Sequence, residues 1–265
     1  MAFYVQKHGE VIPQDIRNKI STRYHTVTKA INEEFWMINN SELHSLYVGS
    51  YGRGTAIKSS DLDILIQLPE SEYYRYDAYK GNGQSQLLQT VKNAILNKYP
   101  NSNISADGQI VKIDFTDGIQ FEILPAFQNN NIYIYADTNN GGKWRSTNPK
   151  AEQEAMYLKN RDSNGLLFDT CKHIRKIRDA KFSSEELTGI VIDSFVFTTI
   201  GYWHWCAEGE LSAMPIGSYE KYLYQQAIVI EKSFQGIMHA PGSGLQVNYS
   251  DSINTLQKVL KFMAY

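Results

Sequence analysis

Hydrophobic residues at spacings of three and four predict helices in the first part of the chain. One long amphipathic helix is expected from Pro13 to Trp36, with Pro13 suited to the first turn. Its apolar positions are Ile16, Ile20, Tyr24, Val27, Ile31 and Phe35. A second helix is expected from about Gln86 to Tyr99, before Pro100. The stretch Glu70–Gln84 is polar, rich in tyrosine and contains two glycines, so it is predicted to be a loop.

Shorter hydrophobic runs predict strands. Leu46–Val48 and Leu62–Leu68 consist largely of Leu, Val and Ile, which is typical of buried strands. Ile110–Phe115 alternates between apolar and polar residues, a Thr-Asp-Gly turn follows, and Ile119–Leu124 returns as the second strand of a hairpin. A short strand is expected at Ile132–Tyr135.

The pattern becomes largely helical near Pro149. The helices expected there are Phe168–Ala180, Ser184–Cys206, Ser218–Gly236 and Ser252–Tyr265. We therefore predict an α/β (α+β) protein with two domains. Residues 1–150 would form a catalytic lobe with a mixed sheet, and residues 151–265 would form a helical lobe.

Composition narrows the class of protein. The chain has 265 residues, of which 42% are hydrophobic and 20% charged, enough for two lobes with a common cleft. Its net charge of -2 gives no global basic field for nucleic acid. Two cysteines, Cys171 and Cys206, are too few for a disulfide framework or a cysteine zinc site. The sequence contains neither a signal-peptide core nor a run of about 18 apolar residues, so we expect a soluble, cytoplasmic protein with no membrane partner.

The main candidate chemistry lies between Leu46 and Leu68. Asp61 and Asp63 are two residues apart at a strand, so their carboxylates would point to the same side. Neighbouring carboxylates repel each other unless a cation neutralises them, and oxygen ligands suit Mg²⁺ or Mn²⁺. Gly49 and Ser50 follow the preceding strand and open a glycine-rich segment, whose backbone N–H groups suit a phosphate. A phosphate cradle beside a metal site is the arrangement that nucleotidyl transfer requires.

Glu122 lies between two apolar residues in the returning strand of the hairpin. Taken alone, such a carboxylate is more often an exposed position on a one-sided strand than a ligand. The upstream motifs change the balance, and we expect Glu122 to be the third metal ligand.

Four segments carry a family resemblance: GSYGRGTAIKSSDLDI, FEILPAF, WRSTNPKAE and a basic helix that ends in FSSEEL. They resemble the CD-NTases, bacterial relatives of cyclic GMP-AMP synthase and of the oligoadenylate synthases, over about residues 10–265. The resemblance implies a polymerase-β-like nucleotidyltransferase core, a long N-terminal spine helix, and a helical lobe that closes the nucleotide cleft.

The resemblance also implies roles for single residues. Asp61, Asp63 and Glu122 would be the catalytic metal triad with two Mg²⁺ ions, and Gly49 and Ser50 would hold the donor triphosphate. The other nucleotide-binding candidates are Lys172, Arg175, Ser184 and Asn148. Lys172 and Arg175 lie three apart on one helix face, with Arg175 the slightly better match, although such residues are often only a solvated face. Ser184 has a second explanation as a helix N-cap. Glu185 stands where animal relatives have a base-stacking tyrosine.

The expected activity is the joining of NTPs, GTP or ATP or both, into a cyclic dinucleotide, with a purine product such as cyclic di-GMP favoured. The resemblance implies a product-sensing effector protein in anti-phage signalling and, without a zinc insertion, no obligatory nucleic-acid activator. We expect a monomer. Because the Gly-Ser and Asp-x-Asp motifs are shared more widely, a nucleotidyltransferase for an antibiotic, tRNA or protein acceptor remains the alternative.

Overall fold

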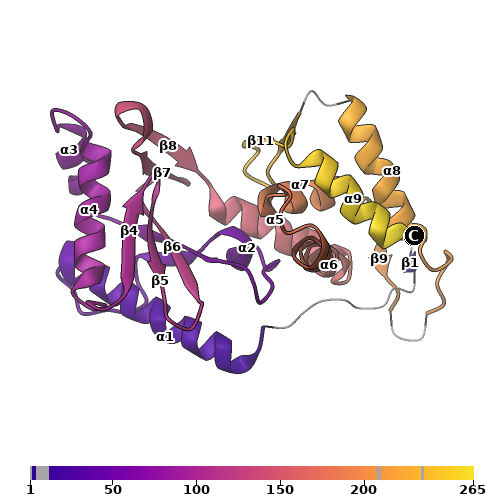
Figure 1. Cartoon of the computed structure of the whole chain (residues 1–265), viewed down its shortest axis with the longest axis horizontal. Coiled ribbons are helices and arrows are strands. Elements are labelled where there is room, and N and C mark those ends of the chain that lie inside the picture. Colours follow the sequence, from indigo (N-terminus) through magenta and orange to yellow (C-terminus); the bar gives the residue numbers. More distant parts are fainter. Residues whose placement is uncertain (1, 4–11, 208–209, 234–235) are drawn as a thin grey trace. The chain divides into compact units, whose positions relative to one another are not determined.

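A computed structural model describes residues 2–3, 12–207, 210–233 and 236–265 (Figure 1). These residues divide into two compact units. Ile12–Gly52 and Ser60–Pro149 form one, which we call the sheet unit. Lys150–Tyr265 forms the other, the helical unit, together with the short segment Arg53–Ser59. The chain therefore changes unit twice between Gly52 and Ser60.

Within the described residues, the sheet unit contains a seven-stranded mixed sheet with the order β2-β3-β6-β5-β4, to which β7 and β8 are added beside β6. The strands are β2 (Ser45–Tyr47), β3 (Leu62–Gln67), β4 (Asn103–Asp107), β5 (Ile110–Asp114), β6 (Gln120–Asn129), β7 (Ile132–Asp137) and β8 (Lys143–Thr147). Strands β3 and β6 are parallel, and the other pairs are antiparallel. The α/β class and the mixed sheet are thus confirmed, as is the hairpin of β5 and β6.

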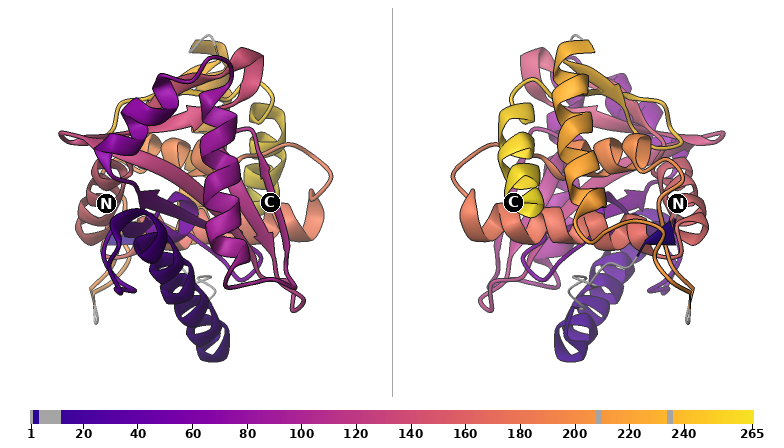
Figure 2. Two further views of the ribbon diagram at one scale, coloured as in Figure 1. Left: turned by 90° about the vertical axis from the view of Figure 1, so that its left-hand side faces the viewer. Right: turned by 90° about the vertical axis from the view of Figure 1, so that its right-hand side faces the viewer.

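Helices cover one face of this sheet. They are α1 (Gln14–Ile31), which continues into the π-helical turn η1 (Asn32–Trp36), α3 (Glu70–Asp77) and α4 (Gly83–Leu96). Helices α1 and α4 lie against this face of the sheet (Figure 2, left). Leu62, Ile64 and Ile66 alternate along β3, are at most 2% exposed, and pack with apolar side chains of α1 and α4. The opposite face of β3 carries Asp63 and Leu65. The predicted spine helix is confirmed.

One prediction for the sheet unit was wrong: the predicted loop Glu70–Gln84 contains α3, which buries Tyr76 against the core. No element was predicted for the segment after Lys143, which contains β8, a strand that pairs with β7. In both segments polar residues outnumber apolar ones, because little is buried there: α3 buries Tyr76, and no residue of β8 is fully buried.

The helical unit consists of α5 (Pro149–Asp162), α6 (Leu166–Lys181), α7 (Gly189–Thr199), α8 (Ser218–Ser233) and α9 (Ile253–Ala264), with two small strand pairs. The pairs are β1 (Ala2–Phe3) with β9 (His204–Trp205), and β10 (Ile237–His239) with β11 (Gln246–Asn248). Helix α7 is apolar on every side and its core residues are fully buried. Helices α8 and α9 lie side by side (Figure 2, right). The predicted helix Ser184–Cys206 is shorter at both ends than expected.

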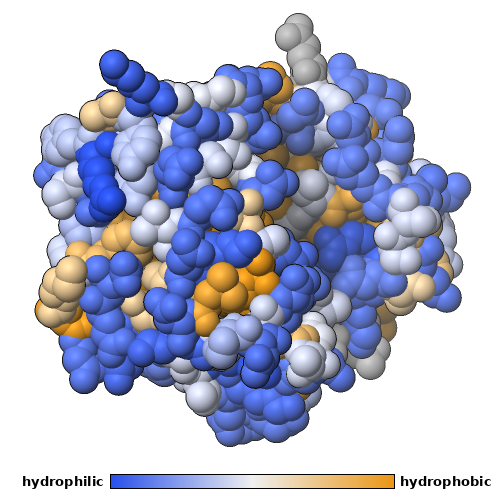
Figure 3. Space-filling view, turned by 60° about the vertical axis from the view of Figure 1, so that its left-hand side comes forward, coloured by the Kyte–Doolittle hydropathy of each residue, from blue (hydrophilic) through white to orange (hydrophobic). Residues whose placement is uncertain are grey.

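Hydrophilic side chains predominate on the surface shown in Figure 3, and hydrophobic ones form separate small patches. None of the helices in the described ranges is long and apolar enough to cross a membrane.

Asp137 on β7 is bound by Arg145 on β8, and the charge of Asp137 should make the stability of this strand pair depend on pH. It is 1% exposed and accepts hydrogen bonds from Arg145 (Nε, 2.5 Å) and from the backbone and side chain of Asn139 (3.1 and 2.8 Å). Burial raises the pKa of Asp137, but these hydrogen bonds and the charge of Arg145 outweigh it and lower the pKa to about 2. The stabilising contribution of the carboxylate is therefore present above the ordinary pKa of an aspartate, and it is lost as pH falls toward 2.

We expect Asp137→Asn to lower the thermal midpoint at pH 7 and this difference to shrink between about pH 4 and pH 2. Asp107→Asn removes an exposed carboxylate from β4 of the same sheet and should have little effect at any pH. Thermal unfolding followed by circular dichroism across that pH range measures both variants. An Asp137→Asn deficit that does not change with pH would contradict the electrostatic explanation.

Candidate active site

The sheet brings two of the predicted metal ligands into register on the face opposite α1 and α4. Asp63 on β3 is the Cα partner of Glu122 on the parallel strand β6. Paired residues of neighbouring strands point to the same side, so both carboxylates project from the face opposite α1 and α4. Asp61 precedes β3, which begins at Leu62, and its side chain is exposed rather than part of the strand. Asp61 thus lies one residue before the strand, which begins at Leu62 as predicted.

Gly49 lies directly against Asp63. It opens α2 (Gly49–Gly52) with a φ of +56°, and a Cβ atom there would be 1.8 Å from Oδ2 of Asp63. The N–H of Val48 donates to the carbonyl oxygen of Asp63 at 2.9 Å, which fixes the start of this turn on β3. Only glycine combines that backbone conformation with that contact. Ser50 follows in α2 and is partly buried, so the Gly-Ser pair is positioned by the strand that carries Asp63.

Too little positive charge surrounds Glu122 to balance its own carboxylate and that of Asp61. Burial raises the pKa of Glu122, the negative charge of Asp61 raises it further, and Lys112 offsets part of this effect. Lys112 on β5 is the Cα partner of Glu122 and lies on the same face. Asp63, Glu122 and Lys112 thus form a row across three adjacent strands.

Three carboxylates with oxygen donors fit a hard divalent cation better than a soft metal. In the parts of the chain that the structure describes, no three His, Cys, Asp or Glu side chains already converge on one ion position. The metal role of the triad therefore stays a prediction.

Lys172 and Arg175 on α6 differ sharply in exposure. Lys172 is partly buried, and burial lowers the pKa of its ammonium group. Arg175 is 1% exposed, and its guanidinium binds both oxygens of Asp193, at 2.7 and 2.9 Å, and the carbonyl oxygen of Gly189 at 2.9 Å. The burial argues against the triphosphate contact predicted for Arg175, because its donors already have partners within the core. Lys172 remains the candidate on this helix.

Ser184 is exposed in a turn that precedes α7, and the residue at the helix N-cap position is Thr188. The N-cap explanation of Ser184 was therefore wrong. The adjacent Glu185 accepts hydrogen bonds from Lys258 at 2.7 Å and from Thr255 at 3.2 Å, so its side chain is engaged with α9. Asn148 lies between β8 and α5 and is partly buried. The nucleotide-binding roles of Ser184 and Asn148 stay predictions.

Sequence reasoning missed Lys112 and the buried partners of Arg53. Lys112 could have been found, because the hairpin predicted for Ile110–Leu124 places it on the strand next to Glu122. Arg53 binds Asp193, 140 positions further along the chain. No local pattern signals a pair at that separation.

We expect Arg175→Lys to lower the free energy of unfolding of the helical unit, because a single ammonium group cannot replace three guanidinium contacts to Asp193 and Gly189. Removing one partner of a buried ion pair costs about 3–5 kcal/mol, and we expect a loss that approaches this range. Lys172→Met is the comparison on the same helix and should change stability little. Urea unfolding measures both variants. Equal stability for the two would contradict the structural role of Arg175 and return it to the nucleotide-binding candidates.

Comparisons with known proteins identify the family and the fold. The family model of the Second Messenger Oligonucleotide or Dinucleotide Synthetase (SMODS) domain matches residues 9–160, which is more than half of the chain. The search of curated proteins gives no match.

Solved structures with the same fold include three synthases. The chain is similar to the Elizabethkingia meningoseptica CdnE cyclic dinucleotide synthase with GTP and Apcpp, with a TM-score of 0.65, 13% identity, and coverage of 94% of this chain and 92% of the other. The STING-associated CdnE c-di-GMP synthase of Capnocytophaga granulosa gives a TM-score of 0.63 at 13% identity, with coverage of 93% of this chain and 81% of the other. The Rhodothermus marinus CdnE c-UMP-AMP synthase with Apcpp and Upnpp gives a TM-score of 0.62 at 12% identity, with coverage of 97% of this chain and 92% of the other.

The identities are low, so these structures establish the polymerase-β-like fold, and the family model establishes the family. The chain belongs to the Second Messenger Oligonucleotide or Dinucleotide Synthetase family and is a nucleotidyltransferase of the CD-NTase type.

Proposed function

We propose that this chain joins two nucleoside triphosphates into a cyclic dinucleotide and releases pyrophosphate at each step. The observation that carries the proposal is the contact between Gly49 and Asp63, together with the register of Asp63 and Glu122. This arrangement puts a backbone that suits phosphate next to carboxylates that suit a divalent cation. In each step a ribose hydroxyl oxygen would attack an α-phosphorus atom, and the bond to the β-phosphate would break.

Asp61, Asp63 and Glu122 are the residues that would hold the divalent ions, and we propose two Mg²⁺ ions, with Mn²⁺ able to replace them. Bound ions would lower the pKa of the attacking hydroxyl and stabilise the charge of the leaving pyrophosphate. The carboxylates would hold these ions in place, while Gly49 and Ser50 would fix the triphosphate so that attack is in line, which is a large part of catalysis in phosphoryl transfer.

Gly49 and Ser50 would hold the donor triphosphate through the backbone N–H groups at the start of α2 and through the serine hydroxyl. From the helical unit, Lys172 would add a positive charge to the triphosphate, and Ser184 would donate a hydrogen bond to it or to the ribose. Asn148 would contact a base. These assignments follow the family resemblance of the segments that contain the residues, and Arg175 is left out because it is buried.

For the product we favour purines, with cyclic di-GMP as the leading candidate and GTP, ATP or both as substrates. Similar structures include a c-di-GMP synthase and a c-UMP-AMP synthase, so base choice varies on this fold. The product would act as a second messenger on an effector protein in anti-phage defence.

We expect purified protein with all four radiolabelled NTPs and Mg²⁺ to form a phosphatase-resistant product, and Asp63→Ala and Asp61→Ala to abolish it. Removing a carboxylate displaces the reacting groups without removing a buried apolar side chain, so both variants should remain folded. Thin-layer chromatography after phosphatase treatment measures the product, and omission of one NTP at a time identifies its bases. Wild-type turnover by either folded variant would contradict the triad.

A wild-type protein that is folded, binds NTPs and gives no resistant product would point to the alternative, transfer of a nucleotide to an antibiotic, tRNA or protein. That outcome is tested by adding such acceptors and measuring pyrophosphate release.

We expect Gly49→Ala to lower kcat by roughly 100-fold, because the new Cβ atom would displace the carboxylate of Asp63. Gly118→Ala is the matched control: Gly118 has a φ of +85° but no heavy atom lies within 4 Å of a Cβ atom there. Both variants carry the strain of a left-handed backbone, roughly 1–2 kcal/mol. Steady-state assays measure kcat, and an equal loss in the two variants would show that strain alone, rather than contact with Asp63, is responsible.

A further inference from the structure

The segment Arg53–Ser59, which we call the strap, lies in the sequence between the two motifs of the candidate site. Gly49–Gly52 precedes it and Asp61–Asp63 follows it, and both belong to the sheet unit, whereas the strap belongs to the helical unit. Gly52 and Arg53 are consecutive residues. Whatever holds Arg53 therefore acts on the end of the proposed phosphate loop through a single peptide bond.

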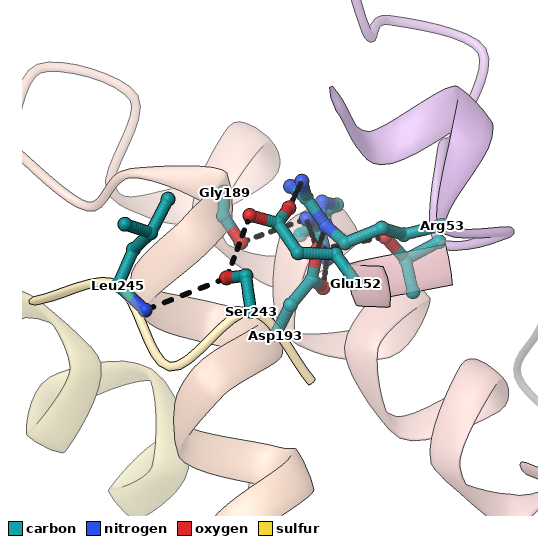
Figure 4. Close-up of polar contacts among 8 residues, drawn as sticks. Arg53, Glu152, Gly189, Asp193, Ser243 and Leu245 are labelled. Carbon is teal, nitrogen blue, oxygen red and sulfur yellow. Dashed lines mark hydrogen bonds and ion pairs between the residues drawn. The ribbon is translucent and has the colours of Figure 1, made fainter. Parts of the chain in front are cut away.

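Arg53 binds acidic residues from two different helices (Figure 4). Its Nε atom donates to Oδ2 of Asp193 on α7 at 2.9 Å, and its Nη1 atom donates to Oε2 of Glu152 on α5 at 3.0 Å. The side chains of Arg53 and Glu152 are each 9% exposed, and that of Asp193 is 0% exposed. The guanidinium thus holds the first residue of the strap inside the helical unit.

One further charge and one hydroxyl group complete this cluster. Arg175 also binds Asp193, so two guanidinium groups face two carboxylates and the formal charges balance. Ser243 donates to the second oxygen of Glu152 at 3.2 Å (Figure 4). Because buried charges are costly unless paired, every member of the cluster has a strong preference for this one arrangement.

The rest of the strap is held as well. Thr55 donates to Oδ2 of Asp193 at 3.0 Å, and Ser59 donates to Asp179 on α6 at 2.5 Å. Gly54 has a φ of +76°, and a Cβ atom there would be 2.5 Å from the ring of Phe168. Contacts at the beginning, middle and end of the strap therefore fix it on α5, α6 and α7.

We propose that Arg53 is a positioning residue for the nucleotidyl transfer reaction. By holding the start of the strap, Arg53 would limit the backbone freedom of the residue that directly follows Gly52. The backbone of Gly49–Gly52 would then be restrained at its start by the hydrogen bond from Val48 to Asp63 and at its end by the strap. This inference rests on the proposed use of Gly49 and Ser50 as the triphosphate loop.

The test compares Arg53→Lys and Thr55→Val with two controls. Lysine keeps the charge of Arg53, but its single ammonium cannot present separate donors to two carboxylates. Thr55→Ser keeps the hydroxyl that Thr55→Val removes. Tyr249→Phe removes a buried hydrogen bond to the carbonyl oxygen of Ile230 (3.0 Å) in the same unit, apart from the strap, and reports loss of stability alone.

Amide hydrogen exchange followed by mass spectrometry, on the full chain without nucleotide, is the first readout. We expect faster exchange in peptides that cover Val48–Gly52 for Arg53→Lys and Thr55→Val, and wild-type exchange for Thr55→Ser and Tyr249→Phe. Steady-state product formation is the second readout. We expect kcat to fall roughly 10- to 100-fold in Arg53→Lys, with a smaller change in KM, because misalignment affects the reacting geometry.

A purely structural role for Arg53 predicts a different result. In that case Arg53→Lys would behave as Tyr249→Phe does, with a lower thermal midpoint but unchanged exchange at Val48–Gly52 and unchanged kcat, and the proposal would be overturned. Should Arg53→Lys fail to fold, Thr55→Val against Thr55→Ser decides in the same way. If the wild type makes no product from any NTP, the proposed function fails, while the exchange result still tests whether the strap restrains the loop.

Discussion

The candidate site depends on the register between the parallel strands β3 and β6. This register pairs Asp63 with Glu122 while Ile64 pairs with Ile123 on the other face, beneath α1 and α4. A shift by one residue would bury the carboxylates against the helices and expose the isoleucines, at a large cost in free energy. The hydrophobic core therefore enforces the geometry of the acidic row. Gly49 adds to this constraint because its Cα lies against Asp63.

The sequence was informative where an element has a strong period. The apolar positions of α1 and the alternation in β5 and β6 were sufficient to predict these elements, since each buries a regular set of side chains. Prediction failed where burial is slight, as in α3, and where tertiary pairing overrides a local signal. The predicted strand stops at Leu124, before Pro125, but Pro125 lies inside β6. On one side of β6, the pairing with β5 extends to Ile123 and the pairing with β7 begins at Ala126, so Pro125 lies in the gap between the two. A residue without an N–H group is tolerated at that gap.

The same distinction applies to the site. Gly49, Ser50 and the carboxylates could be predicted as site residues because their residue types and spacing fit the chemistry directly. The role of Arg175 could not be read from its helix, because a phosphate-binding arginine and one that binds a buried aspartate have the same local sequence pattern. Its partner Asp193 lies 18 residues later on α7. A single aspartate in this largely apolar helix was the available sign of a buried charge that needs a cationic partner.

Asp193 and Glu122 differ in how much positive charge the protein places beside their carboxylates. Burial disfavours the charged form of both Asp193 and Glu122, yet the pKa of Asp193 is lowered because Arg175 and Arg53 outweigh burial. The pKa of Glu122 is raised, since Asp61 adds to the effect of burial and Lys112 offsets only part of it. The fold thus supplies guanidinium groups to Asp193 and leaves Glu122 with excess negative charge, as expected if the first carboxylate is structural and the second belongs to the proposed site. The arginine nearest to the phosphate loop in sequence, Arg53, binds Asp193, so the positive charge that the site requires must come from elsewhere. Divalent cations and Lys172 are the sources that the proposed reaction provides.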